Sequence, residues 1–174
     1  GRGIEIILGL AKYLKNINFA IVGGNKEDLI KYLKFRSIPN LKFFGHQPHS
    51  KISLFLNSMN CLLMPYQRKV SVGYKNSDTS RWMSPIKMFE YMSSNTPVIA
   101  SNLPVLREVL KNKKNCLLAK PTSILDWKEK INLLIKNKYL SGQLSFNARK
   151  DFLNKFTWEK RAKNILSIFK QQNH

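Results

Sequence analysis

The chain has 174 residues, 43% of them hydrophobic, which suits one domain with a sizeable core and excludes a disordered tail. Lysine and arginine number 30 against 10 acidic residues, so the formal net charge at pH 7 is +20. No apolar run approaches the roughly 20 residues that a membrane-spanning helix needs, which excludes that class of protein.

The positive charge has four competing explanations. A basic surface can bind nucleic acid, face anionic lipid or attract a phosphorylated substrate, and a lysine-rich composition can also reflect genomic bias. The basic residues are dispersed along the chain and form no arginine-rich helix or zinc finger, so specific nucleic-acid binding is not expected. We expect genomic bias to account for most of the charge, with a peripheral contact to anionic membrane next.

Helical and strand-like patterns alternate along the chain. In order, they predict a helix at 4–13, a strand at 19–22, a helix at 26–35, a strand at 41–44, a helix at 50–58 and a strand at 61–64. After a polar stretch they predict a helix at 85–94, a strand at 98–100, a short helix at 104–110 and a strand at 116–119. Helix is expected from 124 onward, with a break near 154–156 and a new N-cap at Thr157.

The predicted strands are continuously apolar and are separated by helices, which is typical of a parallel sheet covered on both faces. We therefore predict an α/β fold with a Rossmann-like, doubly wound parallel sheet. The first helix has no strand before it and Gly1 follows no signal peptide, so the start resembles the interior of a longer protein. Cys61 and Cys116 lie in strand-like runs and are expected to be buried free thiols of a cytoplasmic protein.

A polar stretch at 67–83 precedes the helix at 85–94. It contains Gly73 and several serines, has no apolar stripe, and is long for a loop in a compact domain. Such loops are commonly functional. We predict a lid that is mobile without ligand and ordered with it.

The helix at 85–94 carries the most informative chemistry. Ser84 is a suitable N-cap and Pro85 suits the first helical position. The backbone N–H groups at this start, together with the helix dipole, favour an anion such as a diphosphate. Glu90 lies one turn after Ile86 on the same face, where a carboxylate can accept hydrogen bonds from both hydroxyls of a ribose. An ordinary helix start with a surface glutamate is the simpler alternative.

An ordered series of segments resembles the signature of family 4 glycosyltransferases, which have the GT-B architecture of two Rossmann-like domains facing a cleft. The resemblance covers nearly the whole chain and matches the C-terminal, donor-binding domain. Its segments are 1–5, 21–24, 44–45, 63–66, 84–92, 96–101, 103–108 and 156–159. It implies that residues 1–174 form the nucleotide-sugar-binding half, and that the N-terminal acceptor domain is absent from this chain.

The resemblance also implies roles for single residues. In the family, two glutamates separated by seven residues contact the donor; Glu90 matches the second, which holds the ribose, whereas the first falls at Trp82. Trp82 either anchors the loop or stacks on the sugar, and Asp78 or a backbone group of the loop is a candidate substitute for the missing glutamate. Arg2 is either a phosphate ligand or the first exposed residue of a helix. Lys87 either touches phosphate or is a solvated or ion-paired charge.

Glycines at predicted strand ends support a ligand cleft at the carboxyl edge of the sheet. The predicted strand ends carry Gly23–Gly24, Gly45–His46, Pro65–Tyr66 and Ser101–Asn102, and a glycine lets a nucleotide approach the backbone closely. A tight turn explains Gly23–Gly24 equally well. His46, which follows Gly45, is either near the nucleobase or an ordinary loop residue. The three histidines and two cysteines have no metal-binding spacing, and neither a metal nor a cofactor is expected.

The function implied by the resemblance is retaining transfer of a hexose from a nucleotide sugar to a cell-surface polysaccharide or glycolipid, at or near the inner face of the membrane. The acceptor site and any catalytic base are expected on the missing domain, so this domain alone should bind donor without turnover. A nucleotide-sugar epimerase of the same architecture is the first alternative, and a basic nucleic-acid-binding module is the second.

Overall fold

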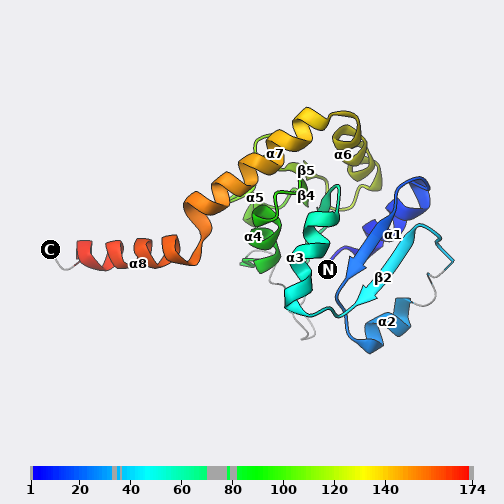
Figure 1. The fold of residues 1–174 in the computed structure, drawn as a ribbon, viewed down its shortest axis with the longest axis horizontal. Coiled ribbons are helices and arrows are strands. Elements are labelled where there is room, and N and C mark those ends of the chain that lie inside the picture. The colour runs from blue at the N-terminus through cyan, green and yellow to red at the C-terminus, as the bar shows by residue number, and fades with distance from the viewer. Residues whose placement is uncertain (1, 33–34, 36, 70–77, 79–81, 173–174) are drawn as a thin grey trace.

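The computed structural model describes the chain except residues 1, 33–34, 36, 70–77, 79–81 and 173–174 (Figure 1). In chain order its elements are α1 (Ile4–Tyr13), β1 (Phe19–Val22), α2 (Lys26–Tyr32), β2 (Leu41–Gly45), α3 (His49–Ser58), β3 (Leu62–Met64), α4 (Ile86–Ser93), β4 (Val98–Ser101), α5 (Pro104–Arg107), β5 (Leu117–Ala119), α6 (Ile124–Lys136), α7 (Lys138–Asp151), the π-helical turn η2 (Phe152–Phe156) and α8 (Trp158–Gln172).

All strand pairs are parallel, which confirms the predicted α/β class. β1 pairs with β2, with Phe19 opposite Leu41, while β4 lies between β3 and β5, with Ile99 opposite Leu117. The strands form two separate sheets instead of the single sheet that the sequence predicts. Within the described part of the chain, no strand lies between β1 and β3 to join their backbones.

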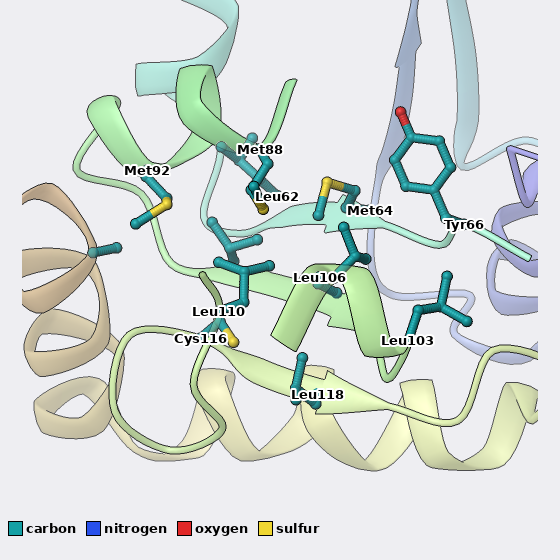
Figure 2. Close-up of a cluster of buried hydrophobic side chains, with 13 residues drawn as sticks. Leu62, Met64, Tyr66, Met88, Met92, Leu103, Leu106, Leu110, Cys116 and Leu118 are labelled. Atoms are coloured by element: carbon teal, nitrogen blue, oxygen red, sulfur yellow. The ribbon is translucent and has the colours of Figure 1, made fainter. Parts of the chain in front are cut away.

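Two hydrophobic clusters cover the two faces of the β3–β4–β5 sheet, as expected for a doubly wound fold. Because side chains alternate along a strand, Val98 and Ala100 of β4 belong to one cluster and Ile99 belongs to the other. The first cluster packs α4 and α5 on the sheet, and Figure 2 shows Met88 and Leu106 within it. The second cluster packs α1 and α6 and also includes residues of β1 and β2. This second cluster therefore holds the two sheets together.

The helical and strand predictions are largely confirmed, with differences at three places. α3 has no buried residue, so the predicted inward positions Ile52, Phe55 and Leu56 are only partly covered. α5 ends at Arg107, three residues before the predicted end. The predicted continuous helix after 124 is divided at Asn137, whose side-chain oxygen accepts a hydrogen bond from the backbone N–H of Leu140 at 2.9 Å. Asn137 is an N-cap, which explains the new helix.

The C-terminal helix α8 extends away from the body of the molecule (Figure 1). It starts after Thr157, whose hydroxyl accepts a hydrogen bond from the N–H of Lys160 at 3.3 Å, so the predicted N-cap is confirmed. Every residue from 158 to 168 is exposed, including Trp158 and Ile165. No helix within the described residues has the length and apolar content needed to cross a bilayer.

The two cysteines are free, as predicted. Cys116 is buried and Cys61 is partly buried, and burial raises the pKa of each thiol to about 12. Both thiols are therefore protonated and unreactive at neutral pH. The predicted lid at 67–83 lies mostly outside the described residues, so its mobility stays a prediction.

Candidate functional site

The carboxyl ends of the strands meet at one edge of the fold, where ligands of open parallel sheets bind. Gly45 is the last residue of β2, is buried and has a φ of 63°, and its carbonyl accepts a hydrogen bond from the N–H of Gly23 at 2.7 Å. Only glycine adopts such backbone angles readily. The structure thus places the predicted Gly45 at this edge, where the backbone lacks a side chain that would keep a ligand away.

α4 begins at the same edge, but not as the sequence predicts. Ser84 does not cap the helix. Pro85 occupies the N-cap position with an extended ψ of 120°, and no side chain of the described residues caps the helix. Ser84 lies one residue further out and is exposed. The first backbone hydrogen bond of the helix runs from the N–H of Met88 to the carbonyl of Pro85 at 2.9 Å. The N–H groups of Ile86 and Lys87 come before this bond in the chain. These uncapped groups are suited to an anion.

Glu90 projects from α4 into the space between α4 and α3. One oxygen of its carboxylate lies 4.0 Å from Nε2 of His49, the first residue of α3, and the Glu90 side chain is 34% exposed. Ile86, one turn earlier on the same face, is 72% exposed. The predicted ribose carboxylate is therefore accessible, and it lies beside the chain segment that leaves Gly45.

Two cations lie close to this helix start. Desolvation and the Arg2 guanidinium both lower the pKa of the Lys87 amine, while the Glu90 carboxylate raises it. A fall in pKa caused by a like charge means that the fold holds Arg2 and Lys87 near each other. Such a pair is stabilised by an anion between the two cations. The structure therefore brings the predicted Arg2, Lys87 and Glu90 together.

Backbone packing explains why Arg2 reaches α4. Gly3 has a φ of 74°, and a Cβ atom built on it would overlap the carbonyl oxygen of Pro65, the residue after β3. This close approach fixes the start of α1 against the end of β3. Arg2 is consequently near the residues that follow β3 as well as near Lys87.

Two tyrosines form the inner wall of the site. The sequence predicted Tyr66 at a strand end beside the cleft, whereas Tyr91 was not predicted. Burial raises the pKa of Tyr66 and the Arg2 guanidinium opposes this shift, which places Arg2 close to the phenol. Burial, with Tyr66 and Glu90 adding to it, raises the pKa of Tyr91 to about 12. Both phenols stay protonated and can donate hydrogen bonds. The position of Tyr66 directly after a buried strand was the signal that the sequence offered.

Two further predicted residues, Asp78 and Trp82, belong to the segment before α4. Asp78 is exposed, and its neighbours on both sides lie outside the described residues, so its contact with donor stays a prediction. Trp82 is 85% exposed and lines a separate pocket beside α4, so it does not anchor the loop by burial. Among the described residues, no group of three or more His, Cys, Asp or Glu side chains is placed to hold a metal ion.

Comparisons with known proteins agree with this geometry. The sequence profile of the family described as glycosyl transferases group 1 matches residues 2–151. An uncharacterized glycosyltransferase of Methanocaldococcus jannaschii is 25% identical over 172 residues, which are 98% of this chain and 45% of that protein. The chain thus spans less than half the length of this relative.

Solved structures show the same fold. HepE from Anabaena in complex with UDP has a TM-score of 0.78 at 16% identity, over 98% of this chain and 45% of that one, and it is also solved with UDP-glucose. The C-terminal domain of a glycosyl transferase group 1 family protein from Francisella tularensis has a TM-score of 0.70 at 17% identity, over 90% of this chain and 80% of that one. The predicted fold of one GT-B half is confirmed.

Proposed function

Because this chain belongs to the group 1 glycosyl transferases, we propose that it binds the nucleotide-sugar donor of a retaining hexosyl transfer. The observation that carries the proposal is the convergence of Arg2, Lys87 and Glu90 at the uncapped start of α4. The residues supply what a nucleoside diphosphate requires: cations for the phosphates and a carboxylate for the ribose.

The diphosphate lies at the start of α4 in this proposal. The N–H groups of Ile86 and Lys87 donate hydrogen bonds to its oxygens, and the side chains of Arg2 and Lys87 neutralise its charge. Negative charge accumulates on the diphosphate as the glycosidic bond to it breaks. Fixed donors and cations that meet this charge stabilise the transition state more than the ground state.

The nucleoside lies along α4 and toward the β2–α3 connection. Glu90 accepts hydrogen bonds from the ribose hydroxyls, in the space that separates it from His49. Gly45 lets the base approach the backbone at the end of β2, and His46 follows at the same edge. Tyr91 and Tyr66 line the inner side of the cluster as protonated hydroxyl donors.

The complete enzyme is proposed to carry the acceptor site on a preceding domain, with this chain as its C-terminal, donor-binding half. The acceptor is a cell-surface polysaccharide or glycolipid, and the enzyme works in the cytoplasm at the inner face of the membrane, where the net charge of +20 favours anionic lipid. The chemistry uses neither a cofactor nor a metal. This domain alone is proposed to bind donor without turnover, because the acceptor site is proposed to lie on the other domain.

Titration calorimetry at 50 and 200 mM salt tests the proposal with UDP, GDP and a single-stranded oligonucleotide. We expect one of the diphosphates to bind at both salt concentrations, because directional hydrogen bonds add to the charge at α4. We expect oligonucleotide binding to disappear near physiological salt, since a mainly electrostatic complex with roughly six phosphate contacts weakens about 10³-fold over this range. Tight oligonucleotide binding with no diphosphate binding would overturn the proposal.

A further inference from the structure

The side chain of Gln67 bridges two strand ends at the carboxyl edge of the larger sheet. Its Nε2 donates hydrogen bonds to the carbonyl of Pro65 at 2.9 Å and to the carbonyl of Pro121 at 3.0 Å. Pro65 follows β3 and Pro121 lies just beyond β5, and β4 separates these two strands in the sheet. Gln67 therefore links backbones that the sheet itself keeps about 10 Å apart.

The amide group of Gln67 is matched to these two acceptors. A glutamine amide has two N–H donors, whereas a carbonyl oxygen can only accept. Both donors are therefore used in the bridge, and the opposite orientation of the amide would set its oxygen against two carbonyl oxygens. The hydrogen bond to Pro121 joins residues 54 positions apart in the chain. The bridge is thus a tertiary contact and not a local turn.

The bridged carbonyl of Pro65 is also the group against which Gly3 packs. A Cβ atom on Gly3 would overlap this oxygen, so the backbone of Gly3 lies directly on it. The oxygen is consequently confined between the amide of Gln67 and the start of α1. Arg2 precedes Gly3, and its guanidinium opposes the rise that burial causes in the pKa of Tyr66, the next residue after Pro65. Two separate observations therefore place Arg2 beside the peptide that Gln67 holds.

We infer that Gln67 is a positioning residue of the donor site, which holds Arg2 where its guanidinium meets the diphosphate. This role rests on the proposed donor-binding function. Gln67 acts through the Pro65 carbonyl and through Gly3, which packs on that carbonyl. Without the bridge, the Pro65 peptide can rotate and Arg2 loses the fixed place that makes a cation effective toward developing charge. A glutamine that only ties β3 to β5 is the alternative, and its effect would be independent of Arg2.

A double-mutant cycle separates these two roles. Gln67→Met keeps the length of the side chain and removes both donors, and Arg2→Met removes the positioned charge. Calorimetry gives the dissociation constants of UDP and GDP for the wild type, the two single variants and the double variant. Gln143→Met on α7, where the glutamine is exposed, is the matched control. Gln67→Asn, whose amide is one methylene too short to reach both carbonyls, takes the place of Gln67→Met if the latter does not fold.

We expect Gln67→Met to weaken diphosphate binding about threefold or more, and to change it by less than about twofold once Arg2 is already replaced. The Gln143→Met control should bind like the wild type. A loss of the same size with and without Arg2, or no loss in Gln67→Met, would overturn the positioning role alone. Absence of diphosphate binding in the wild type would instead overturn the proposed function.

The pKa of Lys87 provides a second measurement, which needs no donor. Desolvation and then Arg2 lower this pKa, while Glu90 raises it, so a displaced Arg2 should let the pKa rise. The pH profile of Lys87 acetylation by acetic anhydride, followed by mass spectrometry, should shift to higher pH in Gln67→Met and in Arg2→Met, and no further in the double variant. An unshifted profile in Gln67→Met would contradict the positioning of Arg2 by Gln67, whether or not the protein binds a diphosphate.

Discussion

The carboxylate of Glu90 lies 4.0 Å from the imidazole of His49, at a place where two otherwise distant segments meet. Glu90 belongs to α4, which follows β3, whereas His49 opens α3, which follows β2. The contact joins α4, whose start is the proposed phosphate site, to the connection that leaves Gly45. A ribose bound to Glu90 is thereby placed between the two proposed halves of the donor site.

Replacing Glu90 with Gln should weaken diphosphate binding at least about tenfold. The substitution keeps the shape of the side chain but removes the charge that strengthens two hydroxyl contacts, each worth about 1.5–3 kcal/mol when desolvated. The melting temperature should stay constant, because the carboxylate is partly exposed and pairs only weakly. Calorimetry with UDP and GDP measures the effect, with Glu129→Gln as the control. Unchanged affinity in Glu90→Gln would remove this residue from the site.

Replacing His49 with Ala should change diphosphate affinity by less than about fivefold. The His49 side chain is 94% exposed, and an exposed ion pair contributes about 0–1 kcal/mol. The same titrations therefore separate a residue that binds ribose from a neighbour that only adjoins it. A loss as large as that of Glu90→Gln would show that His49 itself contacts the donor.

The contribution of Lys87 to diphosphate binding should decrease as pH rises into the alkaline range. Desolvation and Arg2 lower the pKa of its amine from 10.5, so the free protein loses this positive charge at lower pH than an ordinary lysine does. Binding a diphosphate favours the charged form, and the contribution of Lys87 is lost as pH rises through the lowered pKa. We expect Lys87→Met to bind more weakly than wild type at pH 7, with the difference narrowing toward pH 10.

The control for this titration is Lys138→Met at the start of α7, which removes an exposed positive charge away from the site. It should bind like wild type at every pH. Because the comparison is between proteins with the same ligand, ionisation of the nucleobase affects all curves equally. A difference between Lys87→Met and wild type that stays constant with pH would contradict the role assigned to Lys87.

Gly3→Ala should destabilise the fold by about 2 kcal/mol or more. The substitution combines a φ of 74° with a Cβ atom that overlaps the carbonyl of Pro65, so the backbone has to move. Gly142→Ala is the matched control: a Cβ there meets nothing within 4 Å, and alanine in a helix interior stabilises by about 0.5–1 kcal/mol relative to glycine. Urea unfolding should show opposite signs for the two variants.

Asp151 should contribute a stability that disappears in acid. Partial burial raises its pKa, but hydrogen bonds from Asn115 at 2.9 Å and Lys155 at 3.2 Å outweigh this and lower the pKa below 3.8. A carboxyl group whose pKa is lowered in the folded protein stabilises the fold at pH values above its pKa in the unfolded chain. This stabilisation is lost as pH falls toward and through the lower, folded-state pKa. Asp151→Asn should therefore lower the free energy of unfolding by about 1–3 kcal/mol at pH 7 and by less at pH 3. Equal losses at both pH values would contradict this.

Local sequence patterns were sufficient to predict most of the architecture. Apolar runs predicted the parallel strands, and β1 matches its predicted bounds because Phe19–Val22 is β-rich and ends at Gly23. Boundaries that depend on capping were less predictable. Ser84 is a residue type that commonly caps helices, yet the N-cap of α4 is Pro85, one residue later, which has an extended backbone. The separation into two sheets also has no local signal, because it depends on which strand edges meet in space.

The site was only partly predictable for the same reason. Glu90 and Lys87 share one helix, so their sequence spacing already placed them near the start of α4. The proximity of Arg2 to Lys87 depends on the contact between Gly3 and Pro65, which brings together residues 62 positions apart in the numbering. The position of Tyr66 at a strand end was predictable from the sequence, whereas the part of Tyr91 depends on its burial in the fold. Trp82 and Glu108 line one pocket although they belong to different elements, and no pattern in the chain connects them.

The separation of the β1–β2 sheet from the β3–β4–β5 sheet has a consequence for the energetics of partial opening. No backbone ladder links β1 to β3 within the described strands, so the smaller sheet can detach when the apolar contacts through α1 and α6 are lost together with polar contacts of α3, such as the hydrogen bond from the Thr96 hydroxyl to the Leu56 carbonyl. Its amide hydrogens should exchange with solvent through a sub-global opening of lower free energy than that of β4. A donor that touches both Gly45 and α4 would act as a clamp between two folding units, and native-state exchange would then register ligand most strongly in β1 and β2.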